Sequence, residues 1–207
     1  MIILAIDPGS NTGYCLIEVN KKVANIYGWG QFEVDKTSHY QGDWCISVMD
    51  WLEGLVDLHE VNHIVIEDYF FNRFSAMGGS LNIAFRAALW IRARDLELPY
   101  TIISIGSWKK FIAGRTRPDK PLVRKYGKEL SKKIMIQEAL WKKWGIKFSN
   151  FSIGKKGKVC KPNMDLVDAV GQALFYCHEH LKVDKVTTSV KIDEADLSKV
   201  KWKYYKY

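Results

Sequence analysis

The pattern of apolar and polar positions predicts strands in the first third of the chain. Aliphatic and aromatic residues dominate Ile2–Ile6, Tyr14–Val19 and Val23–Phe32, and short polar turns separate these runs, which is typical of an antiparallel meander. The run Ile2–Ile6 is apolar throughout, as expected for a central strand buried on both faces. Two later runs, His63–Ile66 and Tyr100–Ile105, predict a fourth and a fifth strand.

Before, between and after these two strands, apolar residues recur at helical spacing. The predicted helices cover about Asp43–His59, Leu81–Leu96, Lys132–Trp144 and a last segment that starts near Asn163. The order up to the third of these helices, βββαβαβα, predicts an α/β fold with a mixed five-stranded sheet, three antiparallel strands followed by parallel ones, flanked by helices. The length suits one domain, over residues 1–183. The pattern weakens beyond Val183, so residues 184–207 are expected to form a basic and aromatic C-terminal extension.

A lone acidic residue stands at the end of two of the predicted buried strands. Asp7 ends the first strand and is followed by a Pro-Gly-Ser turn, and Glu67 ends the fourth. A carboxylate in such a position is costly unless it is paired, hydrogen-bonded or bound to a cation. For each residue alone, the ordinary alternative is a buried polar group satisfied by backbone donors.

Two further carboxylates lie near the start of the last helix. Asp165 and Asp168 are three residues apart, so they project from neighbouring points of one helix face. An acid near a helix N-terminus ordinarily stabilises the helix dipole, and this role suits Asp165 better than Asp168. Asp168 stands beside Ala169 and Val170, where the apolar stripe of the helix is expected to be buried. We therefore predict that the four carboxylates form one metal site.

The four predicted ligands all bind through oxygen. Because no His or Cys accompanies them, they favour a hard cation such as Mg²⁺ over Zn²⁺. Two such ions, ~3.5–4 Å apart, can activate water on one side of a phosphodiester and stabilise the leaving oxygen on the other. The predicted chemistry is therefore phosphodiester hydrolysis.

The net charge of the chain, formally +8, is concentrated in one segment. Between Lys109 and Lys161 there are 17 Lys and Arg residues against three acids, while the rest of the chain is net acidic. Aromatic residues are interleaved with these charges, and nucleic-acid bases stack on such rings. The segment predicts a nucleic-acid partner, although a solvated, lysine-rich insertion without a partner has the same composition.

The cysteines and the hydropathy indicate an intracellular protein. The four cysteines have no CxxC spacing, so we expect them to be reduced and buried. A zinc site is disfavoured because the available ligands lack the usual spacing of ligand pairs; they are Cys160, Cys177, His178 and His180. No apolar run approaches the roughly 18 residues that span a bilayer, and the N-terminus lacks signal-peptide features, so we expect no membrane contact.

Several motifs resemble those of the RuvC Holliday junction resolvases. They are Ile6-Asp7-Pro8-Gly9-Ser10 with Thr12-Gly13-Tyr14, the strand end Ile66-Glu67 with Phe70 three residues beyond, Lys109 five residues before Gly114, and Asp165-x-x-Asp168-Ala169. The turn after Ser10 is one residue shorter than in bacterial members. The stretch Arg115–Ser131 looks like a family-divergent insertion. Similar divergent, basic members of the family occur in bacteriophages, so the resemblance is to a phage-type resolvase.

The resemblance implies an RNase H-like fold and a homodimer that makes paired nicks in four-way DNA junctions, with two Mg²⁺ or Mn²⁺ ions per active site. The implied ligands are Asp7, which would bridge the two ions, Glu67, Asp165 and Asp168. Phe70 matches an aromatic residue that stacks on bases near the junction centre. Lys109 and Lys133 match basic residues that contact DNA near the scissile phosphate. The implied setting is DNA recombination and repair in the cytoplasm of a bacterial or phage-infected host cell.

Two other classes of protein remain open. Actin-like and sugar-kinase ATPases also begin with an aliphatic strand and an Asp-x-Gly turn, but they usually need two such halves, and no second Gly-rich turn follows a strand here. A non-catalytic DNA-binding module of the same fold would gain nothing from an acidic cluster facing phosphate. Within the fold, an RNase H or an exonuclease is the nearer alternative.

Overall fold

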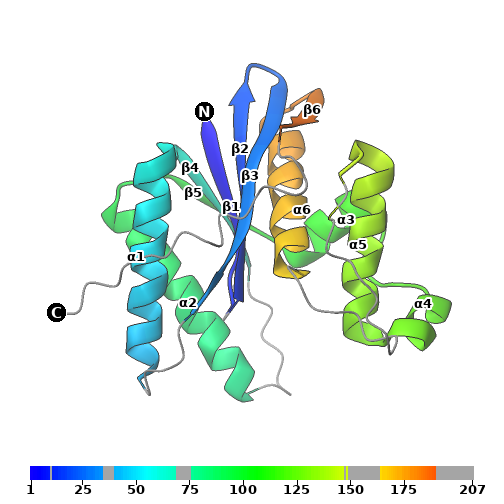
Figure 1. The fold of residues 1–207 in the computed structure, drawn as a ribbon, viewed down its shortest axis with the longest axis horizontal. Coiled ribbons are helices and arrows are strands. Elements are labelled where there is room, and N and C mark those ends of the chain that lie inside the picture. The colour runs from blue at the N-terminus through cyan, green and yellow to red at the C-terminus, as the bar shows by residue number, and fades with distance from the viewer. Residues whose placement is uncertain (10, 35–39, 69–75, 147, 149–163, 190–207) are drawn as a thin grey trace.

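The computed structural model describes residues 1–9, 11–34, 40–68, 76–146, 148 and 164–189 (Figure 1). The strands are β1 (Ile2–Asp7), β2 (Asn11–Asn20), β3 (Val23–Glu33), β4 (His63–Glu67), β5 (Tyr100–Ile103) and β6 (Lys185–Thr188). The helices are α1 (Gln41–His59), α2 (Ala76–Asp95), α3 (Ile105–Ala113), α4 (Lys120–Tyr126), α5 (Lys128–Trp144) and α6 (Met164–Glu179). The predicted α/β class is confirmed.

The strands form one mixed sheet in the order β5-β4-β1-β2-β3-β6. β1, β2 and β3 are antiparallel and β4 and β5 run parallel to β1, which confirms the predicted meander followed by parallel strands. The tight turn between β2 and β3 passes through Lys21, whose φ of 54° lies in the left-handed region that short hairpin turns require. β1 is central because both of its faces are apolar: Leu4 and Ile6 belong to one core, and Ile3 and Ala5 to the other.

The sheet has a sixth strand that the sequence pattern did not predict. β6 lies in the stretch assigned to the C-terminal extension, and it pairs in parallel with Val23–Ile26 of β3. The hydroxyl of Thr187 donates to the carbonyl oxygen of Ala24 at 3.3 Å. A four-residue edge strand without a fully buried side chain carries too little periodicity to be recognised from sequence.

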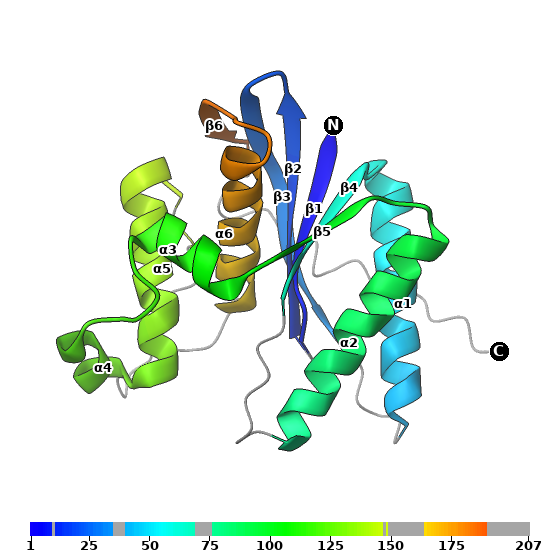
Figure 2. The same ribbon diagram turned by 180° about the vertical axis from the view of Figure 1, so that it is seen from behind.

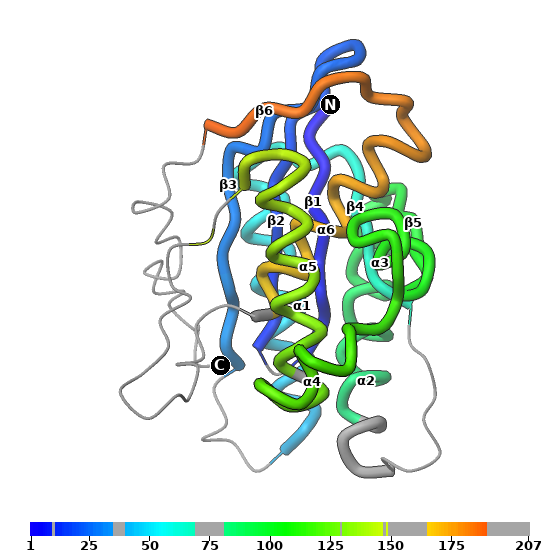
Figure 3. The backbone as a smooth tube through the Cα atoms, turned by 90° about the vertical axis from the view of Figure 1, so that its right-hand side faces the viewer, coloured from blue at the N-terminus to red at the C-terminus, as the bar shows by residue number. Residues whose placement is uncertain are grey.

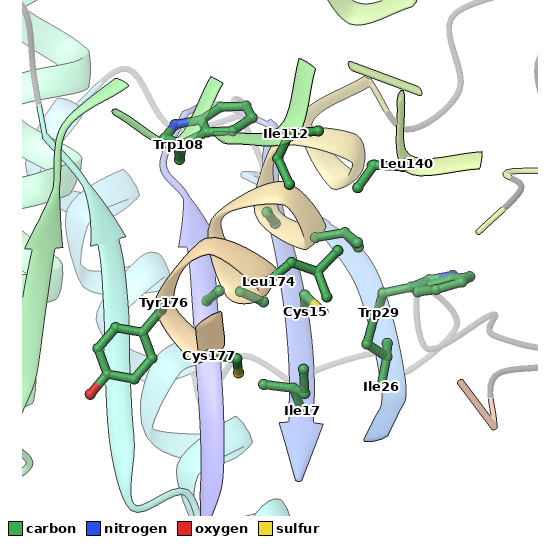
Figure 4. Packing of buried hydrophobic residues seen from close by; sticks show 14 of the residues in the cluster. Cys15, Ile17, Ile26, Trp29, Trp108, Ile112, Leu140, Leu174, Tyr176 and Cys177 are labelled. Carbon is green, nitrogen blue, oxygen red and sulfur yellow. The ribbon is translucent and has the colours of Figure 1, made fainter. Parts of the chain in front are cut away.

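Helices cover both faces of the sheet. α1 and α2 lie on one face, and α3, α5 and α6 lie on the other (Figures 1 and 2). On the second face, Trp108 and Ile112 of α3 and Leu174 of α6 belong to the same core as Cys15 and Ile17 of β2 (Figure 4). Apolar packing on both faces holds the central strands between two layers of helices.

Helices α3 and α4 were not predicted. The strand expected over Tyr100–Ile105 ends at Ile103, because Ser104 is the N-cap of α3. α4 lies within the Arg115–Ser131 stretch, and it sits beside the start of α5 at the end of the molecule where β1 and β4 also end (Figures 1 and 3). Both helices are short, with nine and seven residues, so a periodic signal hardly develops in them.

Candidate active site

Two acidic side chains end neighbouring parallel strands. β1 ends at Asp7 and β4 ends at Glu67. The register pairs Ile6 with Ile66, so the two carboxyl ends meet at the same edge of the sheet. Asp7 is 9% exposed and Glu67 is 6% exposed, so both carboxylates are buried in the protein.

Helix α6 brings two more carboxylates to this edge because a glycine lets the helix approach the sheet. Gly13 of β2 lies opposite Asp7, and a Cβ atom at Gly13 would lie 2.3 Å from the carbonyl carbon of Asp165. The first turn of α6 therefore packs directly on the backbone of β2. Asp165 and Asp168 line the same pocket as Asp7 and Glu67, and the volume of this pocket is about 460 Å³.

The two lysines predicted to contact DNA also lie at this pocket. Lys133 Nζ, from α5, lies 3.4 Å from Asp165 Oδ1 and 3.7 Å from Asp7 Oδ2, and it donates a hydrogen bond to Asp168 Oδ2. Lys109 Nζ, from α3, lies 3.9 Å from Asp168 Oδ2. The structure thus brings six of the seven predicted site residues together.

Burial and mutual repulsion control the charges of the carboxylates. Burial raises the pKa of Asp7 well above its usual range, and repulsion by Glu67 adds to this effect. Burial, followed by repulsion from Asp168, also raises the pKa of Glu67. Burial alone would lower the pKa of Lys133, but attraction by Asp168, Asp7 and Asp165 outweighs burial and raises this pKa. The pocket therefore strongly favours a cation.

Three contacts that sequence reasoning missed hold Glu67 in place. Trp108 Nε1 donates a hydrogen bond to Glu67 Oε1 at 2.8 Å. Arg86 Nη2 lies 3.6 Å from Glu67 Oε2, and Arg86 Nε donates to the Glu67 carbonyl oxygen at 2.9 Å. Gly171 of α6 leaves room for the indole, since a Cβ atom there would lie 2.8 Å from the ring. The signal that could have revealed Arg86 is its isolated charge within the otherwise apolar segment 84–90.

A buried threonine closes the turn that follows β1. Thr12 Oγ1 donates to the carbonyl oxygen of Gly9 at 2.8 Å, and the Gly9 N–H lies 3.4 Å from the same hydroxyl oxygen. Thr12 is fully buried. Because Pro8 and Gly9 line the carboxylate pocket, this contact fixes one of its walls.

The chemistry of the four carboxylates fits a hard divalent cation. Among the described residues, no group of three or more His, Cys, Asp or Glu side chains is arranged as a metal site, and the ammonium of Lys133 contacts three of the carboxylates instead. Two observations support the fit. The four acidic side chains offer only oxygen ligands, and Asp168 Oδ1 is buried without a hydrogen-bond partner. A cation in place of the ammonium would give that oxygen a partner.

Three further predictions concern Phe70, the cysteines and the membrane. Phe70 and Cys160 lie outside the described residues. Cys15 and Cys177 are buried as expected, and burial raises the pKa of Cys177 to about 12, whereas Cys45 is half-buried. In the part of the chain that the structure describes, every helix is too short or too polar to cross a membrane.

The sheet and the site together define a class of protein. An antiparallel meander followed by parallel strands, with acidic residues at the ends of β1 and β4 and on a helix packed against β2, is the arrangement of the RNase H-like nucleases. Within this class, the family model described as crossover junction endodeoxyribonuclease RuvC matches residues 3–138. The chain belongs to the RuvC family. The match ends before α6, so the roles of Asp165 and Asp168 rest on the geometry and on their local motif.

Solved structures share this fold at low sequence identity. RuvC from Thermus thermophilus has a TM-score of 0.61 and 15% identity, over 88% of this chain and 98% of that one. T. thermophilus RuvC in complex with a Holliday junction substrate has a TM-score of 0.59 and 16% identity, over 85% and 92%. The yeast mitochondrial Holliday junction resolvase Ydc2 has a TM-score of 0.54 and 14% identity, over 84% and 77%. No curated protein sequence matches the chain.

Proposed function

We propose that this protein is a structure-selective DNA endonuclease that resolves Holliday junctions and other branched DNA by metal-dependent hydrolysis of phosphodiester bonds. The observation that carries the proposal is the convergence of four carboxylates, from β1, β4 and α6, on one pocket bordered by lysines. Membership of the RuvC family supports the reaction class. Two proteins of the same fold are described with a Holliday junction substrate or as a Holliday junction resolvase, which supports branched DNA as the substrate.

The four carboxylates would hold two Mg²⁺ ions, which Mn²⁺ can replace. When bound, such ions polarise the scissile phosphate and promote ionisation of the attacking water. Asp7 is suited to be the ligand that both ions share, because β1 lies between β4, which carries Glu67, and β2, on which α6 packs. Glu67, Asp165 and Asp168 would complete the ligand set.

Neighbouring polar residues orient Glu67 and offset the negative charge of the carboxylates. Trp108 and Arg86 restrict Glu67 to one orientation, so its carboxylate is ready for a ligand before substrate arrives. Lys109 and Lys133 place ammonium groups beside the carboxylates, where they can donate hydrogen bonds to oxygens of a phosphate group. Phe70, by its resemblance to the family motif, would stack on a base near the junction centre.

We further propose that the protein acts as a homodimer, so that two active sites make paired nicks in one junction. Ile83, Ala87 and Ile91 follow one another at four-residue intervals along one side of α2. Ile83 and Ile91 are 43% and 54% exposed. An outward apolar ridge of this kind supports self-association. Ile91→Glu is expected to convert the dimer into a monomer in sedimentation-velocity measurements.

The two other classes of protein gain no support from the structure. The match to a nuclease family disfavours an ATPase of the actin or sugar-kinase class. A DNA-binding module without catalysis has no use for four carboxylates around one pocket, three of which are at least nine-tenths buried. The proposed setting is recombination and repair of DNA in the cytoplasm of a bacterial or phage-infected cell.

Cleavage of a synthetic four-way junction tests the proposal. The purified protein is incubated with the junction, or with linear duplex of the same sequence, in Mg²⁺, Mn²⁺ or EDTA. We expect nicks in the junction alone, only with metal, leaving 5′-phosphate and 3′-hydroxyl ends. Equal cleavage of the linear duplex would indicate a general nuclease of this fold, and ATP hydrolysis without DNA cleavage would favour the ATPase class.

A further inference from the structure

A second and larger pocket adjoins the carboxylate pocket. Its volume is about 820 Å³, and it lies between the end of β4, the start of α3 and the Arg115–Ser131 stretch. Ile105, Lys109 and Lys132 line both pockets, so the two hollows lie next to each other. A long ligand in the larger pocket can therefore extend to the candidate active site.

The larger pocket is strongly basic. Four cationic side chains line it against one carboxylate, that of Asp68; the cationic residues are Lys109, Arg117, Lys128 and Lys132. The start of α3 also contributes Ser104, Ile105 and Gly106 to the wall. Backbone amides at a helix start favour anions, in addition to the charged side chains. An anionic ligand is therefore the chemical match for this pocket.

Specific contacts hold the wall of the pocket that the Arg115–Ser131 stretch forms. Arg115 forms an ion pair with Asp119 across the loop between α3 and α4. Ser131 is fully buried, and its Oγ donates a hydrogen bond to the carbonyl oxygen of Leu122 at 2.9 Å, which ties α4 to α5. Leu122 in turn packs against the core on the α6 side of the sheet. These contacts hold Arg117 and Lys128 at the rim of the pocket.

Size and position indicate which anion fits. The volume lies in the range of pockets that accommodate ligands larger than a single phosphate. A polyanionic strand is long enough to reach both adjoining pockets, with one phosphate at the carboxylates and its neighbours beside the cationic side chains. A small free anion would occupy only one of them.

We propose that this basic pocket binds the phosphates that flank the scissile phosphate on one side of the cleaved DNA strand. The proposal rests on the proposed function, because it takes the carboxylate pocket as the place of the scissile phosphate. Arg117 and Lys128 then position the strand. Both belong to the stretch that departs from the family pattern. The pocket sets which phosphate reaches the carboxylates.

The test pairs a pocket variant with DNA that lacks single charges. Arg117→Gln with Lys128→Gln removes two pocket charges, and Lys21→Gln with Lys182→Gln removes two exposed charges outside the basic segment. Binding to a four-way junction is measured by fluorescence anisotropy in EDTA over a series of salt concentrations. We expect the pocket variant to lose about one unit or more of the slope of log K against log salt, and about tenfold in affinity, whereas the control changes little.

Junctions with one neutral methylphosphonate at a defined position then locate the contact. With the unaltered protein, neutral groups at one to three positions on one side of the scissile bond should weaken binding several-fold. The pocket variant should be insensitive to the same groups, while the control variant keeps the sensitivity. Equal behaviour of pocket and control variants would overturn this inference. A protein that binds junctions in this pattern and cleaves none would instead overturn the proposed function.

Discussion

The indole Nε1 of Trp108 donates a hydrogen bond at 2.8 Å to Glu67 Oε1, although the two residues are 41 positions apart in the chain. Trp108 is fully buried, and its ring lies against Gly171 of α6, where any Cβ atom would be too close. One side chain of α3 thus connects a candidate ligand on β4 with the helix that carries two others. This connection makes the geometry of the site dependent on core packing.

Replacement of Trp108 by Phe tests this connection. Phe keeps an aromatic ring but is smaller and has no donor, so we expect stability to fall by about 1–3 kcal/mol and junction cleavage to fall ~10–100-fold. Thermal unfolding and single-turnover cleavage measure the two effects. Trp141→Phe, at a tryptophan that is 56% exposed, is the matched control and should leave both unchanged. Unimpaired cleavage by Trp108→Phe would show that Glu67 needs no orientation by the indole.

The close approach of α6 to β2 predicts a severe effect of Gly13→Ala. The added methyl group would lie 2.3 Å from backbone atoms of Asp165, so the helix must move away from the sheet. We expect a loss of stability at the upper end of about 1–3 kcal/mol, together with loss of metal-dependent cleavage. Gly42→Ala is the control, since a Cβ atom there meets nothing within 4 Å. Denaturant unfolding measures the stability of both variants. Similar stability of the two would contradict this prediction.

The raised pKa of Asp7 predicts a specific dependence of stability on pH. Between the usual pKa of 3.8 and the higher value in the fold, the native state binds more protons than the unfolded state, so this group lowers stability as pH rises. Asp7→Asn should therefore raise the melting temperature in EDTA at pH 7, by a few degrees for about 1 kcal/mol, and the gain should shrink as pH approaches 4. Asp57→Asn, at an exposed carboxylate, is the matched control for the loss of one negative charge. A gain independent of pH would contradict this explanation.

Conversion of each carboxylate to its amide separates catalysis from binding. Each change is nearly isosteric but removes one charge from a site that must hold dications; the set is Asp7→Asn, Glu67→Gln, Asp165→Asn and Asp168→Asn. We expect cleavage to fall by about 100-fold or more in each variant. Junction binding in EDTA should persist or tighten, because a less acidic pocket repels phosphate less. Near-normal cleavage by Asp168→Asn, with a lowered melting temperature, would reduce the site to three carboxylates.

The ammonium of Lys133 is the cation that the carboxylates hold in this structure, which predicts competition with added metal. Lys133→Met leaves Asp7, Asp165 and Asp168 without this partner, so the metal-free protein should lose about 3 kcal/mol at pH 7. Mg²⁺ should then stabilise the variant more than the unaltered protein, since no ammonium has to be displaced. Melting curves over a Mg²⁺ titration test this, and equal stabilisation of the two proteins would contradict it.

Local features of the sequence were sufficient to predict much of the site. An acid at the end of an apolar run is visible without any knowledge of the fold, which is why Asp7 and Glu67 stand out. Parallel strands end at the same edge, and the i, i+3 spacing of Asp165 and Asp168 places them on one helix face. Helices α1, α2, α5 and α6, the basic segment and the RuvC motifs follow from equally local patterns.

Contacts between residues far apart in the chain were decided only by the tertiary structure. Nothing near Trp108 or Arg86 in the sequence points to Glu67, and nothing near Gly13 shows that α6 packs against it. The edge strand β6 and the basic pocket around Arg117 likewise depend on which surfaces meet. Periodicity reports which face of an element is buried, whereas the partner of that face is set by packing of the whole chain. The sequence therefore determined the chemistry of this site, and the fold determined how that chemistry is held.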